Sequence, residues 1–305
     1  MKKEVRISII ICTRNREKEL SECIDSLINQ SYKPNKIIIA DNGAIFDSSL
    51  LDIIKKNEIE VLYIKNNRNG TSIARNLSLR QVKEDIVFFF DDDVILDHDY
   101  IKQTIKLFAE DERKNIGIIV GKITNLKKIR MRLLKKIFFL HSDKPYYVLP
   151  SGRNTVATQD INETREVSWA SGGAMAVRGD IARKYTFDES FDIFGFALGE
   201  DLDYSFRIGK SYKIIFNPHS KIFHQNSKKS RIDERKIGFL QVVNRYKFVI
   251  KNMNSLKNKF CFYWSLIGEL ILNLLSIIVY RKTGLERAIG NIKGIYYLLF
   301  NFKKP

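Results

Sequence analysis

Three consecutive aspartates, Asp91, Asp92 and Asp93, follow the apolar run 87–90 and precede further apolar residues. Like charges this close raise one another's pKa and oppose folding unless something positive lies among them. Side chains alternate along an extended segment, so Asp91 and Asp93 are predicted to point one way and Asp92 the other. Two carboxylates converging at the end of a strand form a hard-oxygen site for Mg²⁺ or Mn²⁺, with coordination positions left for phosphate oxygens. A solvated acidic turn is the alternative for a D-x-D sequence alone.

The elements that would position these carboxylates alternate along the first 125 residues. Apolar runs of strand length occupy 6–12, 36–42, 60–64, 85–90 and 115–123, and helical patterns occupy 17–30, 47–56, 70–83 and 98–110. This alternation predicts an α/β fold with a mostly parallel, doubly wound sheet, which binds ligands at the carboxyl ends of its strands. Polar clusters at 12–16, 40–44 and 91–93 fall at those ends. A nucleotide crevice is therefore predicted there.

The alternation of strand and helix patterns ends after residue 125. The stretch 126–140 mixes six basic residues with large apolar ones, and strand-like runs follow at 166–170 and 172–178. An acidic helix start lies at 198–210, and edge strands are predicted at 212–217 and 221–224, before a basic, helical tail. We expect one domain over 1–225, divided near residue 125, and a separate C-terminal region over 226–305.

Composition narrows the class of protein. With 305 residues and 44% hydrophobic residues, the chain can bury a substantial core. Its three cysteines have no paired spacing, which argues against disulfides or zinc and fits a reducing compartment. The basic, apolar start lacks a small-residue cleavage site, so a first strand is expected rather than a signal peptide.

The positive charge is concentrated at the C-terminal end. Residues 221–305 hold 17 Lys and Arg against four acidic residues, which is +13 of the formal net charge of +17. A basic tail on a nearly balanced domain points to a polyanion, either an acidic membrane surface or nucleic acid.

Seven segments in order resemble the family 2 glycosyltransferases, which have the Rossmann-like GT-A fold. They are ISIIICTRNR, IIIADNGA, NGTSIARN, VFFFDDDV, GGAMAVR, GEDLDYSFR and NPHSKIFH, spread over about residues 6–225. Each segment alone is weak, but seven in the family's order are specific. The resemblance implies an inverting, nucleotide-sugar-dependent hexosyltransferase in which D-x-D holds a divalent metal against the donor diphosphate. It makes 1–225 the catalytic domain, with a nucleotide-sugar-binding half (1–125) and an acceptor half (126–225). The region 226–305 is then expected to be a C-terminal membrane-associating region.

Carried over residue by residue, the resemblance assigns roles to named side chains. His224 joins Asp91 and Asp93 as a metal ligand. The nucleotide-sugar residues, including the base-reading Asp41 and Asn42, are Thr13, Asn15, Arg16, Asp41, Asn42, Arg75, Asp92, Gly172 and Gly173. Simpler explanations stay open: Thr13 and Asn15 could cap a helix, Arg75 could be a surface residue, His224 could be structural, and the glycines could form a bulge.

The second acidic cluster would supply the catalytic base. An acceptor hydroxyl must lose its proton as it attacks the anomeric carbon, and a carboxylate with a tuned pKa can accept it. The resemblance makes Asp201 this base, with Glu200 beside it orienting the base or the acceptor. The alternative is that Glu200, Asp201 and Asp203 merely favour a helix N-terminus through its dipole.

The tail contains an apolar stretch, 261–280, of membrane-spanning length. Its polar residues lie on one helical stripe: Ser265, Gly268, Glu269, Asn273 and Ser276. An in-plane amphipathic helix is therefore favoured over a span, and an ordinary core helix is a third possibility. With the basic 126–140 segment, this indicates an anionic lipid surface and a peripheral location on the cytoplasmic face of the cell membrane.

The sequence thus predicts a metal-dependent inverting glycosyltransferase that moves a sugar, from UDP by family frequency, to a lipid-linked or cell-surface glycan. A metal-dependent sugar nucleotidyltransferase is the rival enzyme, although its glycine-rich loop is missing. A basic nucleic-acid-binding protein is the non-enzymatic rival. Its basic residues would need stacking aromatics on the same face, whereas here they border aliphatic helices and the expected crevice is acidic, so no nucleic acid is expected. The sugar, acceptor, linkage and oligomeric state cannot be read from the sequence.

Overall fold

The computed structural model describes residues 4–126, 131–156, 161–227, 232–280 and 282–300. The chain divides into two compact units. The sheet unit comprises 1–126, 160–195 and 200–230, and the helical unit comprises 127–159, 196–199 and 231–305. The segment 127–159 thus groups with the C-terminal helices rather than with the rest of 1–225. The functional division into donor, acceptor and membrane-associating regions stays a prediction.

The sheet unit carries the predicted alternation of strands and helices. Its elements in chain order are β1 (Ile7–Thr13), α1 (Glu17–Ile28), β2 (Lys36–Asp41), α2 (Ser49–Lys56), β3 (Glu60–Lys65), α3 (Thr71–Leu79), β4 (Ile86–Asp91), β5 (Val94–Leu96), α4 (Tyr100–Glu110), β6 (Ile116–Ile123), β7 (Arg165–Val167), β8 (Ala174–Arg178), α6 (Gly179–Lys184), η1 (Glu189–Phe191), β9 (Asp192–Ile193), α7 (Glu200–Gly209) and β11 (Lys213–His224).

The central sheet has the order β3-β2-β1-β4-β8-β6-β11-β5, with β7 also paired to β11. Strands β3, β2, β1 and β4 are parallel to one another, and β6 is parallel to β11. Strand β8 lies antiparallel between β4 and β6, and β5 and β7 run antiparallel to β11. The predicted α/β fold with a mostly parallel sheet and a C-terminal helical region is confirmed.

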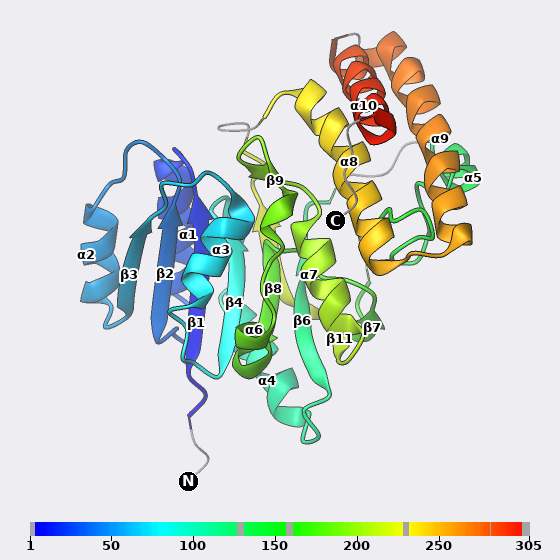
Figure 1. The fold of residues 1–305 in the computed structure, drawn as a ribbon. Helices are drawn as coiled ribbons and strands as arrows, with labels where there is room; N and C mark the ends of the chain where they lie inside the picture. The colour runs from blue at the N-terminus through cyan, green and yellow to red at the C-terminus, as the bar shows by residue number, and fades with distance from the viewer. Residues whose placement is uncertain (1–3, 127–130, 157–160, 228–231, 281, 301–305) are drawn as a thin grey trace. The chain divides into compact units, whose positions relative to one another are not determined.

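Alternation along the strands divides the core between the two faces of the sheet. Ile9 and Phe88 point to one face, where Leu20 and Ile24 of α1 and Ile101 of α4 cover them. On the other face, Phe89 contacts the rings of Phe187 and Tyr204. Figure 1 shows α3, α6 and α7 in front of the sheet and α1 behind it. Because both faces are covered, the strands read as nearly continuous apolar runs.

One expectation about β11 is revised. The sequence predicted separate edge strands at 212–217 and 221–224, but β11 is a single strand with a register shift between Asn217 and Lys221. The Asn217 side chain donates to Ser220 Oγ at 2.8 Å, and this local bond holds the irregular segment within the ladder.

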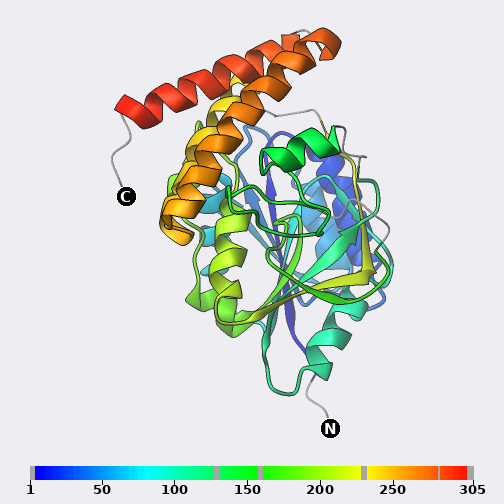
Figure 2. The same ribbon diagram turned by 90° about the vertical axis from the view of Figure 1, so that its right-hand side faces the viewer.

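The helical unit contains α5 (Arg132–Ile137), β10 (Phe196–Ala197), α8 (Glu234–Asn252), α9 (Leu256–Tyr280) and α10 (Lys282–Phe300). Helix α8 begins at an N-cap, where Asp233 accepts a hydrogen bond from the Lys236 backbone at 2.8 Å. Helices α8, α9 and α10 pack against one another (Figure 1 and Figure 2). Within the described residues, no helix has the length and apolar character needed to cross a bilayer.

The polar stripe of α9 faces the interior of the helical unit. Ser265 and Glu269 are buried, and both carboxylate oxygens of Glu269 accept hydrogen bonds from the Arg245 guanidinium, at 2.9 and 3.0 Å. Asn273 donates to Asn291 of α10 at 2.6 Å. Glu269 and Asn273 of α9 are therefore hydrogen-bonded to α8 and α10 inside the bundle, and the side of α9 away from them is apolar.

Candidate active site

The register of the sheet brings the predicted polar clusters to one edge of the sheet unit. Cys12 at the end of β1 is paired with Asp91, and Thr13 is paired with Asp41 at the end of β2. Phe90 is paired with Ala174, the first residue of the antiparallel β8, so the glycines before β8 reach the same edge. Parallel strands thus place three carboxyl ends together, and the antiparallel strand adds an amino end.

Asp91, Asp93 and His224 form a cluster that could hold a metal ion. One ligand atom from each lies within 4.8 Å of the others. His224 Nε2 is 3.6 Å from Asp91 Oδ2 and 3.7 Å from Asp93 Oδ1. Burial raises the pKa of Asp91, but the hydrogen bond with His224 and the charge of Arg75 outweigh it, so that pKa is lowered. Carboxylates are the donors that Mn²⁺ and Mg²⁺ prefer, and an imidazole can join them at a divalent cation.

Asp92 turns away from this cluster, toward Thr13 and Arg16. Its carboxylate accepts hydrogen bonds from Thr13 Oγ1 and from Arg16 Nη1, both at 2.8 Å. Arg16 also lies 3.6 Å from Asp93. Burial raises the pKa of Asp92 to about 6, although Arg16 opposes the rise. Arg16 thus supplies one of the positive charges that allow three adjacent aspartates to fold.

Asp41 is fully buried and holds the loop after β2. Its carboxylate accepts hydrogen bonds from the Gly43 backbone at 2.6 Å and from Tyr63 Oη and Lys65 Nζ, both at 2.9 Å. Asn15, in the left-handed region at φ +52°, accepts a hydrogen bond from the Ala44 backbone at 2.8 Å. Asp41, which was predicted to read the base, therefore holds the conformation of the loop after β2 through hydrogen bonds.

Arg75 is buried between the two acidic clusters. Its Nη1 donates to Glu200 Oε1 at 2.8 Å, and Nη2 lies 3.5 Å from Asp91 Oδ1. The alternative that Arg75 is a surface helix residue is wrong, since it is 3% exposed. Burial alone would lower the pKa of Arg75, but neighbouring carboxylates, led by Glu200, raise it and keep the side chain cationic.

Gly172 and Gly173 leave room for these charged groups. A Cβ on Gly172 would lie 2.7 Å from Arg75 Nη2, and a Cβ on Gly173 would lie 2.4 Å from Asp91 Oδ2. Real Cβ atoms do not come this close, so a side chain at either position would displace Arg75 or the metal-cluster carboxylate. The sequence related these glycines only to a donor sugar or a bulge.

Glu200 and Asp201 begin α7 beside Arg75. Burial, with the charge of Asp201, raises the pKa of Glu200 to about 7, although Arg75 opposes the rise. Asp201 accepts hydrogen bonds from the Gly172 backbone at 2.9 Å and the Leu202 backbone at 2.8 Å. Burial raises the pKa of Asp201 too, against the bond from Gly172. The less buried Asp201 is the carboxylate that an incoming hydroxyl could reach.

A family comparison decides the class of protein. Residues 8–165, just over half of the chain, match the family model described as glycosyl transferase family 2. The chain belongs to this family. The predicted membership is confirmed, and with it the assignment to an enzyme family of transferases. Both rival classes, a sugar nucleotidyltransferase and a nucleic-acid-binding protein, lie outside it.

Individual relatives are more distant. The chain is 29% identical over 121 residues to the poly(ribitol-phosphate) beta-N-acetylglucosaminyltransferase TarP of Staphylococcus aureus, a match that covers 38% of this chain and 36% of TarP. Matches to the first curated relatives cover 24–36% of their length, so the chain spans about a third or less of these proteins.

Two solved structures share the fold. The mannosyltransferase PcManGT of Pyrobaculum calidifontis, solved with GDP-Man and Mn²⁺, has a TM-score of 0.60 at 13% identity, covering 97% of this chain and 88% of that one. Residues 1–349 of S. aureus TarS, solved with UDP-GlcNAc, have a TM-score of 0.52 at 14% identity, covering 98% and 94%. The predicted GT-A fold is thereby confirmed for this family 2 chain.

The site contains a positioning residue that the sequence did not indicate. The carboxylate of Asp192 accepts hydrogen bonds from the Ser72 and Ile73 backbones, at 3.1 and 3.0 Å, and so caps α3, which carries Arg75. A Cβ on Gly70 would lie 2.2 Å from this carboxylate. No local pattern links residues about 120 positions apart. Tyr63 and Lys65 were also missed, but the pairing of Lys65 with Asp41 follows from the strand order.

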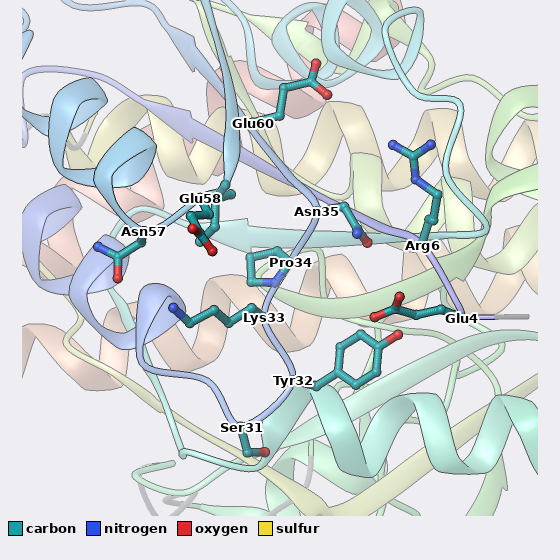
Figure 3. A pocket seen from close by; sticks show the side chains of 11 residues that line it. Glu4, Arg6, Ser31, Tyr32, Lys33, Pro34, Asn35, Asn57, Glu58 and Glu60 are labelled. Carbon is teal, nitrogen blue, oxygen red and sulfur yellow. The ribbon is translucent and has the colours of Figure 1, made fainter.

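A hollow of about 510 Å³ lies at the opposite edge of the sheet, around the amino ends of β1, β2 and β3 (Figure 3). It is lined by Glu4, Arg6, Ser31, Tyr32, Lys33, Pro34, Asn35, Asn57, Glu58, Ile59 and Glu60. Its charges are mixed, and it contains none of the predicted site residues. Ligands of doubly wound sheets bind at the carboxyl edge, so we assign no role in sugar transfer to this hollow.

Proposed function

We propose that the protein transfers a sugar, with inversion, from a UDP-sugar to a glycan acceptor, using a divalent metal held by Asp91, Asp93 and His224. The observation that carries the proposal is the convergence of this cluster with the Arg75–Glu200 pair at one edge of the sheet. Family membership supports sugar transfer, and the UDP-GlcNAc in the TarS structure and the GDP-Man and Mn²⁺ in the PcManGT structure support the donor class and the metal.

The residues around the cluster would bind the donor. A bound divalent cation would neutralise diphosphate charge and so favour departure of the nucleoside diphosphate. Thr13 and Arg16 are hydrogen-bonded to Asp92, and the three residues would line the donor site beside the cation. The loop that Asp41 and Asn15 hold would surround the base. Asn42 bonds to Asn66 at 2.6 Å and would hold that loop as well.

Asp201 would accept the proton in the transfer step. As the acceptor hydroxyl oxygen bonds to the anomeric carbon, its proton passes to the Asp201 carboxylate and the bond to the nucleoside diphosphate breaks. Two backbone N–H groups fix the carboxylate in place, and burial raises its pKa, which makes it a stronger base. Glu200, held by Arg75, would orient the acceptor or the base.

The acceptor and the location are part of the proposal. The name of TarP, which acts on poly(ribitol-phosphate), supports a cell-envelope glycan, and the basic tail supports a lipid-linked acceptor reached from an anionic membrane surface. We place the enzyme on the inner face of the cell membrane as a peripheral protein.

A screen of nucleotide-sugars for donor hydrolysis with Mn²⁺ tests the proposal. A UDP-sugar should be hydrolysed, and excess chelator should abolish the activity. Asp91→Ala and Asp93→Ala should each weaken UDP–Mn²⁺ binding while circular dichroism stays unchanged, and Asp97→Ala, an exposed aspartate nearby, is the control. Full activity in chelator, or in both variants, would remove the metal assignment.

Asp201→Asn tests the base separately. The amide keeps the shape of the site but cannot accept the proton, so turnover should fall roughly 10²–10⁴-fold. UDP affinity should hardly change. Weak UDP binding with normal turnover at saturation would instead place Asp201 in the donor site.

A further inference from the structure

Helix α9 has the reverse of the polarity expected for a surface helix. Its polar residues Ser265, Glu269 and Asn273 face neighbouring helices, whereas its exposed side is apolar. The exposed apolar residues of α9, called the α9 stripe, are Leu256, Phe260, Tyr263, Trp264, Ile267, Ile271, Leu274 and Leu275. Their spacing of three and four residues places them on one face. Phe260 is 66% exposed and Leu274 is 58% exposed, so the stripe lies open to solvent.

Helix α10 has a similar exposed side. Its exposed apolar residues, called the α10 stripe, are Leu285, Ile292, Tyr296, Leu299 and Phe300. In α5, Leu133 and Ile137 are also exposed, and the Trp264 indole donates to the Ile137 carbonyl at 3.0 Å, so α5 adds apolar surface beside the α9 stripe. Soluble monomers rarely expose contiguous apolar patches above a few hundred Å². Surfaces of this kind need a partner.

The packing of α10 shows why its large side chains remain outside. A Cβ on Gly290 would lie 2.1 Å from the Arg235 carbonyl of α8, and a Cβ on Gly238 of α8 would lie 2.4 Å from the Arg287 carbonyl. The two helices therefore touch backbone to backbone through glycine. Small-residue packing of this type is common where helices associate in lipid and their large apolar side chains turn outward.

The charges of α9 and α10 identify anionic lipid as the partner of the two stripes. Lys257, Lys282 and Lys293 are exposed on α9 and α10. Among the described residues of these helices, the only acidic ones are Glu269 and Glu286, which are bonded to Arg245 and Arg235. Facing stripes of two copies would bring like charges together, whereas anionic headgroups attract them. Tyr263, Trp264 and Tyr296 also belong to the aromatic types enriched at membrane interfaces.

We infer that the α9 and α10 stripes insert into the hydrocarbon edge of one leaflet of an anionic membrane, with both helices lying in its plane. The inference rests on the proposed peripheral location and specifies its physical form. Burial of apolar side chains holds the protein, and the lysines add attraction to headgroups. Binding is therefore resistant to salt, unlike docking by charge alone.

Quenching of tryptophan fluorescence tests the insertion. The full chain is mixed with vesicles of equal parts phosphatidylcholine and phosphatidylglycerol whose acyl chains carry bromine, which quenches on contact. Trp264 is 37% exposed in the α9 stripe, and the other tryptophan, Trp169, is buried. We expect quenching in 0.1 M and in 1 M salt, and loss of the quenched component in Trp264→Phe. Binding without quenching, or binding lost in 1 M salt, would overturn the inference.

Substitutions on the stripe have a matched control. Ile271→Gln together with Ile267→Gln should weaken vesicle partitioning about tenfold, because roughly one isoleucine side chain of exposed apolar area is lost. Ile53→Gln on α2 changes an isoleucine of equal exposure, 36% against 37% for Ile271, and should leave partitioning unchanged. Equal effects of the stripe variant and the α2 variant on partitioning would contradict lipid insertion. So would dimers that form without vesicles and are dissociated only by the stripe substitutions.

Donor hydrolysis, measured on the same protein preparations without vesicles, separates this inference from the proposed function. Quenching with no hydrolysis of any nucleotide-sugar would refute the function alone. Hydrolysis with no quenching would refute the insertion alone.

Discussion

At the scale of single residues, the site is organised by guanidinium groups placed between carboxylates. Arg16 contacts Asp92 and Asp93, and Arg75 contacts Asp91 and Glu200. Each guanidinium offsets the repulsion of two acids, and their planar donor forks fix the carboxylate orientations. Strand alternation predicted that Asp91 and Asp93 would separate from Asp92. It could not predict Arg16 as the partner of Asp92, because that contact depends on how α1 follows β1.

The raised pKa of Glu200 predicts a pH-dependent stability. A carboxyl whose pKa rises from 4.5 to about 7 on folding stabilises the protein below pH 4.5, and this contribution is lost as pH rises through 7. Glu200→Gln is neutral at every pH. The Tm of the variant minus that of the parent should therefore rise by a few degrees between pH 5 and pH 8.

Thermal unfolding in chelator, without donor, measures this difference. Glu112→Gln, which changes an exposed glutamate, is the control. A Tm difference for Glu200→Gln that is flat, or falls with pH, would show that Arg75 keeps Glu200 ionised throughout.

At the scale of elements, β-strand register does most of the positioning. The strands could be predicted because each is an apolar run of strand length, and their carboxyl ends could be predicted because parallel strands share an edge. The position of β8 in the sheet could not be predicted in this way. It lies antiparallel next to β4, which brings Gly172 and Gly173 to the cluster. Nor does any periodicity reveal the Asp192 cap, since it joins α3 to a segment beyond β8.

The Asp192 cap predicts an element-level effect. Asp192→Ala would leave two N–H groups at the start of α3 without their acceptor, at a cost of about 0.5–2 kcal/mol in unfolding free energy. Because α3 carries Arg75, the variant should also bind the metal–nucleotide complex more weakly. Thermal unfolding and UDP–Mn²⁺ titration measure the two effects.

Asp188→Ala is the matched control for this cap. Asp188 accepts a hydrogen bond from the Ser190 backbone at 2.9 Å and caps the short η1 rather than α3. It should lower the Tm without changing UDP–Mn²⁺ affinity. If Asp192→Ala and Asp188→Ala behaved alike in the titration, Asp192 would be a structural cap with no positioning role.

At the scale of the whole molecule, the chain separates its chemistry from its basic tail. All of the predicted site residues lie in the sheet unit, and the described tail helices lie in the helical unit with 131–156. The basic, apolar character of the tail could be predicted from composition alone. The direction of its polar stripe could not, because amphipathicity shows that two faces differ but not which of them meets the protein.

The buried pair Arg245–Glu269 predicts how the helical unit is stabilised. Both side chains are nearly inaccessible, and Arg153 lies 3.5 Å from the same carboxylate. Removing one partner leaves a buried charge without its counter-ion, which costs about 3–5 kcal/mol of unfolding free energy. Replacing both residues with apolar residues of similar size is often close to neutral. Glu269→Leu and Arg245→Met should each lower the Tm strongly, and the double variant should recover most of the loss. UDP–Mn²⁺ affinity should remain unchanged in all three. Additive losses in the double variant would mean that the pair contributes packing rather than charge compensation.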